Sequence, residues 1–111
     1  PTAKISKKTL ERLIKREFQN KIEIIKSKFK LINSDSIKGK RRIAAAILKI
    51  ANKDFSKIEE LIIKANYDFR DILAEAEYPR NMINGFEERT KNENKKDYVQ
   101  DWNDYSAWLN Q

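Results

Sequence analysis

The chain of 111 residues contains no cysteine and no histidine. Without cysteine it can form neither a disulfide nor a thiolate nucleophile, and without both residues it lacks the ligands of Cys/His zinc sites. Ser-His-Asp and Cys-His relays are excluded for the same reason. Any enzyme built on this sequence would depend on carboxylates, lysine, arginine, tyrosine or serine. A cysteine-free chain suits a reducing compartment, so we expect a cytoplasmic protein.

Glycine and proline are also scarce, with two residues of each. A β-rich fold with many tight turns needs more of both, so the composition argues against one. No apolar run approaches the roughly 20 residues of a membrane-spanning helix. The first apolar residues stand isolated among lysines, unlike those of a secretory signal. We therefore expect no membrane partner and a single helical domain over residues 1–111.

The apolar residues recur at helical spacing, and the longest such stretch runs from Ser6 to Ile32. Spacings of three and four residues place its apolar side chains on one stripe, which predicts a single amphipathic helix of roughly 39 Å. Ser6 is the expected N-cap. We expect shorter helices to pack along the stripe. We also hypothesise that its N-terminal part, Leu10 to Phe18, stays uncovered and pairs two copies of the chain.

Asn33-Ser34-Asp35-Ser36 is the first run of turn-forming residues, and it separates the long helix from the next one. The second helix is expected from Ile37 to Ala51. Its consecutive alanines, Ala44 to Ala46, let a neighbouring backbone come close, which predicts the most enclosed position in the fold. Lysine and arginine crowd its first turns, where the helix dipole already places positive charge.

Two shorter helices are expected from Lys57 to Ala65 and from Phe69 to Glu77. The first follows a predicted capping box that begins at Ser56, and the second follows an N-cap at Asp68. Phe69 is placed on the inward face of its helix. Because the apolar spacing continues through Asp68 without a slip, one continuous helix is the alternative.

Tyr98, Trp102, Tyr105 and Leu109 repeat by four, three and four residues, which predicts a last helix docked through its aromatic side chains. The polar stretch from Glu87 to Lys96 before it is expected to be a loop or an exposed helical turn. The whole pattern predicts an all-α fold, an irregular bundle of about five helices packed around the long N-terminal helix.

Positive charge is concentrated in the first half of the chain. Residues 1–53 hold 16 lysines and arginines against 4 acidic residues, a net charge of +12, whereas residues 54–111 hold 8 against 13. One hypothesis is a nucleic-acid interface in which the cations contact phosphates. The alternative is that the basic half pairs with the acidic half, within one chain or between two. The candidate nucleic-acid-binding residues are Arg12, Lys15, Arg16, Lys26, Lys30, Lys38, Lys40, Arg41 and Arg42.

Helix-spaced carboxylates raise a metal-dependent alternative. Asp68 and Asp71 stand three residues apart, as do Asp101 and Asp104, so each pair shares a helix face. Converging carboxylates can hold Mg²⁺ for hydrolysis of nucleotide pyrophosphates. The spacing matches no signature of such enzymes, and acids are ordinary in a first helical turn or on the solvated side of a helix. We therefore expect no metal, no cofactor and no catalytic residue.

Arginines and aromatic residues of the second half form another candidate set, because guanidinium groups beside aromatic rings hold planar anions and peptide carboxylates. The same residues can instead lock helix packing, and that interpretation stays open. The candidate partner-binding residues are Arg70, Tyr78, Arg80, Trp102, Tyr105 and Trp108.

The sequence as a whole predicts a small helical protein that is not an enzyme and acts by binding an unidentified protein partner, as a monomer or as a homodimer. Nucleic-acid binding through the basic half is the first alternative. A Mg²⁺-dependent phosphohydrolase is the second.

Overall fold

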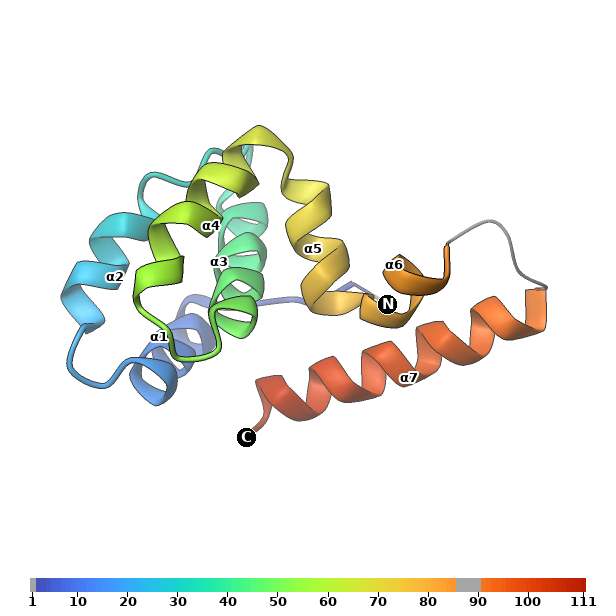
Figure 1. The fold of residues 1–111 in the computed structure, drawn as a ribbon. Helices are drawn as coiled ribbons and strands as arrows, with labels where there is room; N and C mark the ends of the chain where they lie inside the picture. Colours follow the sequence, from blue (N-terminus) through green and yellow to red (C-terminus); the bar gives the residue numbers. More distant parts are fainter. Residues whose placement is uncertain (1, 86–90) are drawn as a thin grey trace.

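A computed structural model describes residues 2–85 and 91–111 of the chain, and these residues form helices without a single β-strand. The helices pack in an irregular bundle (Figure 1), so the all-α prediction is confirmed. The described residues contain seven helices where about five were expected. They are α1 (Lys7–Glu17), α2 (Ile22–Phe29), α3 (Ile37–Ala51), α4 (Ser56–Tyr67), α5 (Phe69–Glu77), α6 (Pro79–Asn84) and α7 (Lys91–Leu109).

The long N-terminal helix is a wrong prediction, because α1 ends at Glu17 and α2 begins at Ile22. Ser6 caps α1 as expected, and its hydroxyl accepts a hydrogen bond from the Thr9 N–H at 3.0 Å. After α1 the chain turns at Phe18, whose ring meets the ring of Phe55 edge-on at 6.3 Å between centroids. The turn lets α2 pack beside α4 rather than continue straight past the core.

The hypothesis of an uncovered stripe from Leu10 to Phe18 is also wrong. Leu13, Ile14 and Phe18 are 0%, 1% and 6% exposed, and they belong to the common core of the chain. Leu10 packs against the same core and is half-buried. The stripe therefore offers no surface for a second copy, and the reason for expecting a homodimer is gone.

Helix α3 is the centre of the bundle, as the alanines predicted. Its residues from Ile43 to Leu48 are all buried, and it contacts α1, α4 and α5. Ser36 caps the helix by accepting a hydrogen bond from the Gly39 N–H at 2.9 Å. A β-carbon at position 39 would lie 2.6 Å from the Ser34 hydroxyl oxygen, so a larger residue would have to displace that hydroxyl. Asn52, in the left-handed conformation with φ 49°, ends the helix.

The break between α4 and α5 is confirmed, and the continuous helix is not. Asp68 has extended backbone angles, and its carboxylate accepts a hydrogen bond from the Arg70 N–H at 3.1 Å, which starts α5. The capping box is wrong, because Ser56 is already the first helical residue. The carboxylate of Asp54 accepts from the Ser56 N–H and hydroxyl at 3.0 and 2.7 Å instead, and these bonds lower the pKa of Asp54.

The C-terminal part is more helical than expected. Pro79 lies in the first turn of α6, where its missing N–H leaves no helical bond unmade. Helix α7 begins at Lys91, so the later part of the polar stretch from Glu87 to Lys96 is helical, and residues 87–90 lie outside the described residues. Figure 1 shows α7 running beneath α6 and α5 toward α1. In the described part of the chain, no helix has both the length and the apolar character needed to cross a membrane.

Candidate functional site

The nine cations predicted to bind nucleic acid are divided among several places. Lys38, Arg41 and Arg42 lie together on the first turns of α3, where they line a cavity with residues 2–6. Lys15 and Lys26 line a separate hollow around the turn between α1 and α2. Lys26 also pairs with Glu11 at 3.7 Å. The turn that breaks the predicted rod therefore separates cations that a straight helix would have aligned.

Arg12 and Arg16 hold the end of α7. Their guanidinium groups donate hydrogen bonds to the main-chain carbonyls of Trp108, Leu109 and Gln111. Arg16 also lies over the Trp108 ring, 4.8 Å from its centroid. Carbonyls at a helix C-terminus lack partners within the helix and carry partial negative charge, so both arginines satisfy them. These two cations fasten the last helix to the first.

Lys40 contacts the main chain just after α2, where its ammonium donates to the carbonyl of Lys30 at 3.1 Å. Arg42 forms a two-bond pair with the carboxylate of Glu77 on α5, at 2.9 and 2.6 Å. Glu77 is 4% exposed, and its hydrogen bonds raise the pKa of Arg42 above the ordinary arginine value. The expected pairing of basic and acidic halves is thus present at Arg42, and also where Lys28 meets Glu59 at 3.5 Å.

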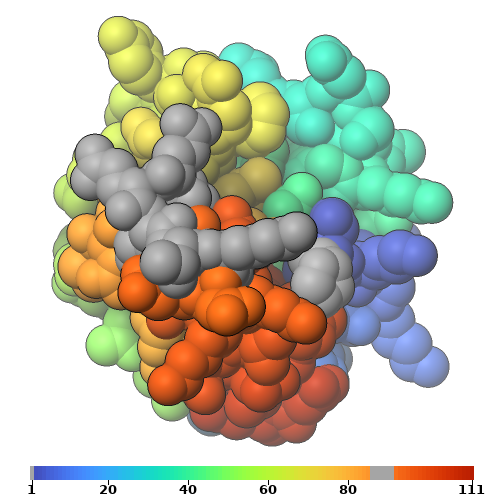
Figure 2. Space-filling model, turned by 90° about the vertical axis from the view of Figure 1, so that its right-hand side faces the viewer, coloured from blue at the N-terminus to red at the C-terminus, as the bar shows by residue number. Residues whose placement is uncertain are grey.

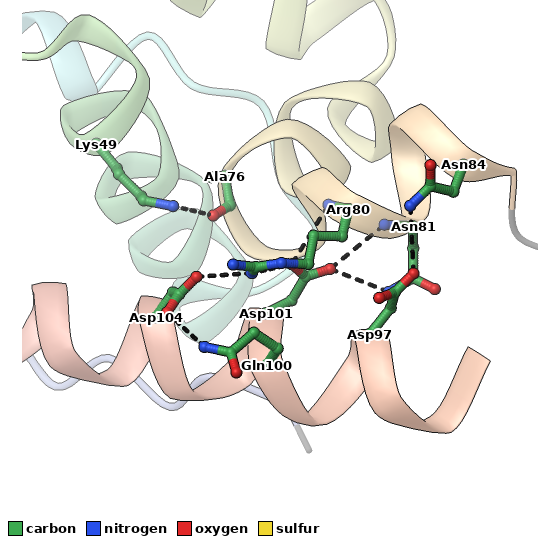
Figure 3. A network of polar contacts seen from close by, with 9 residues as sticks. All are labelled: Lys49, Ala76, Arg80, Asn81, Asn84, Asp97, Gln100, Asp101 and Asp104. Carbon is green, nitrogen blue, oxygen red and sulfur yellow. Dashed lines mark hydrogen bonds and ion pairs between the residues drawn. The ribbon is translucent and has the colours of Figure 1, made fainter. Parts of the chain in front are cut away.

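A network of polar contacts joins α6 to α7 (Figure 3). Asp101 is 1% exposed. Its carboxylate accepts hydrogen bonds from the main chain and side chain of Arg80 and from those of Asn81. The same guanidinium reaches Asp104 at 2.6 Å, which lowers the pKa of Asp104 and raises that of Arg80. The pair Asp101 and Asp104, considered as metal ligands from the sequence, is engaged with an arginine.

Lys49 reaches the edge of this network from α3. Its ammonium donates to the Ala76 carbonyl at 2.7 Å and lies 5.4 Å from the centroid of the Tyr105 ring. Burial lowers its pKa from the ordinary lysine value, against the raising effect of Asp104. Within residues 2–85 and 91–111 no group of three or more carboxylates is placed to hold a metal ion. The contacts of Figure 3 are those of a helix-docking network.

The six predicted partner-binding residues do not form one site. Arg70 is exposed on α5 and pairs with Asp68, which is not one of the six. Tyr78 meets Tyr98 edge-on at 5.6 Å between centroids. Tyr105 is fully buried and stacks on Trp108 at 5.8 Å, and Trp102 packs against the core. Arg80 and the aromatic residues of this set pack α6 and α7 against the rest of the bundle. This is the helix-packing role that the sequence analysis gave as the alternative to partner binding.

The sequence missed an exposed apolar surface at the junction of α4 and α5. We call it the junction surface, and its residues are Leu31, Ile63, Tyr67 and Phe69, exposed by 64%, 64%, 94% and 48%. The side chain of Asn66 holds the chain beside it, donating to the Leu31 carbonyl at 2.9 Å and accepting from the Asn33 N–H at 2.8 Å.

Phe69 was predicted to face inward, and the structure corrects this: it lines a hollow of about 320 Å³ together with Asn33 and Arg42. A signal for the junction surface was present in the sequence. Ile63 stands one position off the stripe that α4 buries, at Ile62, and Leu31 stands one position off the stripe predicted for residues 6–32, which ends at the buried Ile32. An apolar residue next to such a stripe is turned toward solvent on a helix.

These features define an all-helical chain with a basic cavity at the start of α3 and an apolar surface at the junction of α4 and α5. No family model, curated protein or solved structure matches this chain.

Proposed function

We propose that this chain is a non-catalytic interaction module that binds another protein through the junction surface. The observation that carries the proposal is that four large apolar side chains stay in solvent on α4, at the start of α5 and on the loop that Asn66 ties to α4, Tyr67 being 94% exposed. Exposed apolar residues that stand alone are ordinary, whereas a cluster of them marks a contact site. A cytoplasmic location belongs to the same proposal.

The junction surface is also held in shape before any partner arrives. The two hydrogen bonds of Asn66 tie the loop after α2 to the last turn of α4, which fixes Leu31 next to the α4 face that carries Ile63 and Tyr67. A preformed surface loses little conformational entropy on binding. Tyrosine is also among the residues that contribute most to protein interfaces, because its ring buries a large area with few rotatable bonds.

The experiment compares two charge substitutions on apolar residues that are both highly exposed. Tyr67→Asp alters the junction surface, and Ile83→Asp is the matched control because Ile83 is 82% exposed on α6, outside that surface. Both variants should keep the melting temperature of the unmodified chain. In quantitative affinity capture from native extract, we expect a partner retained by the unmodified chain and by Ile83→Asp, but reduced at least about tenfold with Tyr67→Asp. Equal retention by both variants would contradict the proposal.

Nucleic-acid binding is the second candidate, and the exposed cations favour it. Lys15, Lys30 and Lys38 are exposed, and no carboxylate of the described residues lies within ion-pair distance of them. Contacts to phosphates would give an affinity for single or double strands that falls steeply with salt. Lys15→Glu combined with Lys30→Glu should shorten retention on heparin. If no strand is shifted at low salt, this candidate is excluded.

A further inference from the structure

The strongest feature not used by the proposed function is the cavity between the N-terminal segment and the start of α3. It has a volume of about 530 Å³ and is lined by residues 2–6 and by Lys38, Gly39, Arg41 and Arg42. Ala3 and Ile5 are each 5% exposed, so they give it an apolar floor. Figure 2 shows the dark blue N-terminal residues bordering the teal start of α3 on one face of the chain.

The charges of the cavity are of one sign. Lys4, Lys38, Arg41 and Arg42 line it, and no acidic residue does. Glu77 neutralises Arg42 from the buried side. Among the described residues, no carboxylate lies within ion-pair distance of Lys4, Lys38 or Arg41. The Arg41 Nε donates to the Ile5 carbonyl at 2.7 Å, which fixes the guanidinium at the cavity. Its two terminal nitrogens donate to no other described residue, so their hydrogens can meet a ligand.

Two helix starts add to this positive potential. Ser6, the N-cap of α1, lines the cavity together with the first turns of α3, and neither helix carries an acidic residue in its first turn. Cations in the first turn of a helix are disfavoured by the helix dipole, and a bound anion would relieve that cost. An anion bound at the cations of α3 would therefore stabilise the fold more than an anion bound elsewhere on the surface.

We propose that this cavity binds the phosphate monoester group of an organic phosphate. Three uncompensated cations match a group that carries about two negative charges and three acceptor oxygens, and arginine and lysine are the usual donors to it. The cavity exceeds the volume of a phosphate and falls in the size range of pockets for small organic ligands. The apolar floor takes the organic body. A free nucleotide and the 5′-phosphate end of a strand share this chemistry.

The test uses the full chain and adenosine 5′-monophosphate in isothermal titration, with adenosine as the uncharged comparison. We expect the monophosphate to bind and adenosine not to. Lys38→Gln should weaken binding about tenfold, the effect of losing one hydrogen bond between charged groups. Lys40→Gln is the matched control, because it removes the same charge two residues away, outside the cavity. It should change the affinity less than about twofold, because the Lys40 ammonium is bonded to the Lys30 carbonyl and does not line the cavity. An equal loss in both variants overturns the proposal.

Two oligonucleotide arms separate the sources of the phosphate. If a 5′-phosphorylated strand binds and the same strand with a 5′-hydroxyl does not, the ligand is a strand end, and the cavity is a phosphate monoester site as proposed. If both strands bind equally, or if neither the strand nor the nucleotide binds, the proposal is overturned. The result is independent of the junction surface, because Tyr67→Asp leaves every residue that lines the cavity in place.

Discussion

The hydroxyl group of Tyr105 is buried and finds no hydrogen-bond partner among the described residues. Its ring is fully buried, and burial raises the pKa of the phenol well above the ordinary tyrosine value. An unsatisfied buried polar group costs about 1–3 kcal/mol. We therefore expect Tyr105→Phe to leave the free energy of unfolding unchanged or to raise it by about 1 kcal/mol. Urea denaturation measures this. A clear loss of stability would reveal a partner for the hydroxyl, such as a buried water.

Asp101 and Asp104 bind the same guanidinium but differ in burial. Asp101→Ala removes the carboxylate that accepts hydrogen bonds from Asn81, which is 0% exposed, and from the guanidinium of Arg80. Removing the acceptor of a buried hydrogen-bond donor costs about 1–3 kcal/mol. We expect a loss in that range for Asp101→Ala and a much smaller one for Asp104→Ala, whose side chain is 48% exposed. Equal losses in chemical denaturation would contradict the role assigned to burial.

At the scale of single residues, the sequence predicted kinds of side chain better than their partners. It marked Arg80, Asp101 and Asp104 as chemically notable, and all three belong to one network. It could not pair them, because Arg80 and Asp101 stand 21 residues apart and nothing local links them. For the same reason Arg42 and Glu77, 35 residues apart, were placed in opposite halves rather than in contact.

Lys49 ties α3 to the last turn of α5, and its lowered pKa has a consequence for stability. In the unfolded chain its pKa is about 10.4. Between the folded and unfolded pKa values the unfolded chain binds more protons, so the contribution of Lys49 to the free energy of unfolding rises as the pH rises through that window.

We expect the difference in unfolding free energy between the unmodified chain and Lys49→Met to shift in favour of the unmodified chain as the pH rises from about 7 to about 10.5. Urea denaturation at several pH values measures the difference, in which the titration of other groups largely cancels. Parallel stability curves for the two proteins would contradict the lowered pKa.

Helix positions were more predictable than helix ends and connections. The caps Ser6 and Asp68 were identified because a hydroxyl or carboxylate before an apolar stripe is a local signal, whereas for α3 the sequence marked only the run of turn-forming residues that contains its cap, Ser36. The turn at Phe18 was missed because the apolar spacing on its two sides stays nearly in phase. What sets the turn is the packing of Phe18 against Phe55, which lies 37 positions later in the sequence.

At the scale of the whole molecule, burial is concentrated on α3, and we expect local stability to follow it. The residues from Ile43 to Leu48 are 0–3% exposed, whereas most residues of the first two turns of α7 are exposed. Amides that are enclosed on all sides open only with the whole fold. Native-state hydrogen exchange should therefore be slowest in the middle of α3 and faster at residues 92–98. The reverse order would contradict the central position of α3.

The distribution of charge was predicted in amount but not in place. The sequence correctly located the positive charge in the first half, since that follows from counting. Whether cations lie on one face depends on where the chain turns between helices. Arg12 and Arg16 contact the end of α7, whereas Lys38 and Arg41 line a cavity. The N-terminal wall of that cavity, including Lys4, has no local sequence signature. Its position could be found only from the tertiary structure.

The grip of Arg12 and Arg16 on the end of α7 joins the first helix to the last, across 92–99 positions of sequence. The ribosome synthesises α1 well before α7, because α1 comes first in the chain. The guanidinium groups of the nascent α1 therefore lack these carbonyl partners until α7 has been synthesised. The bundle closes only after that step.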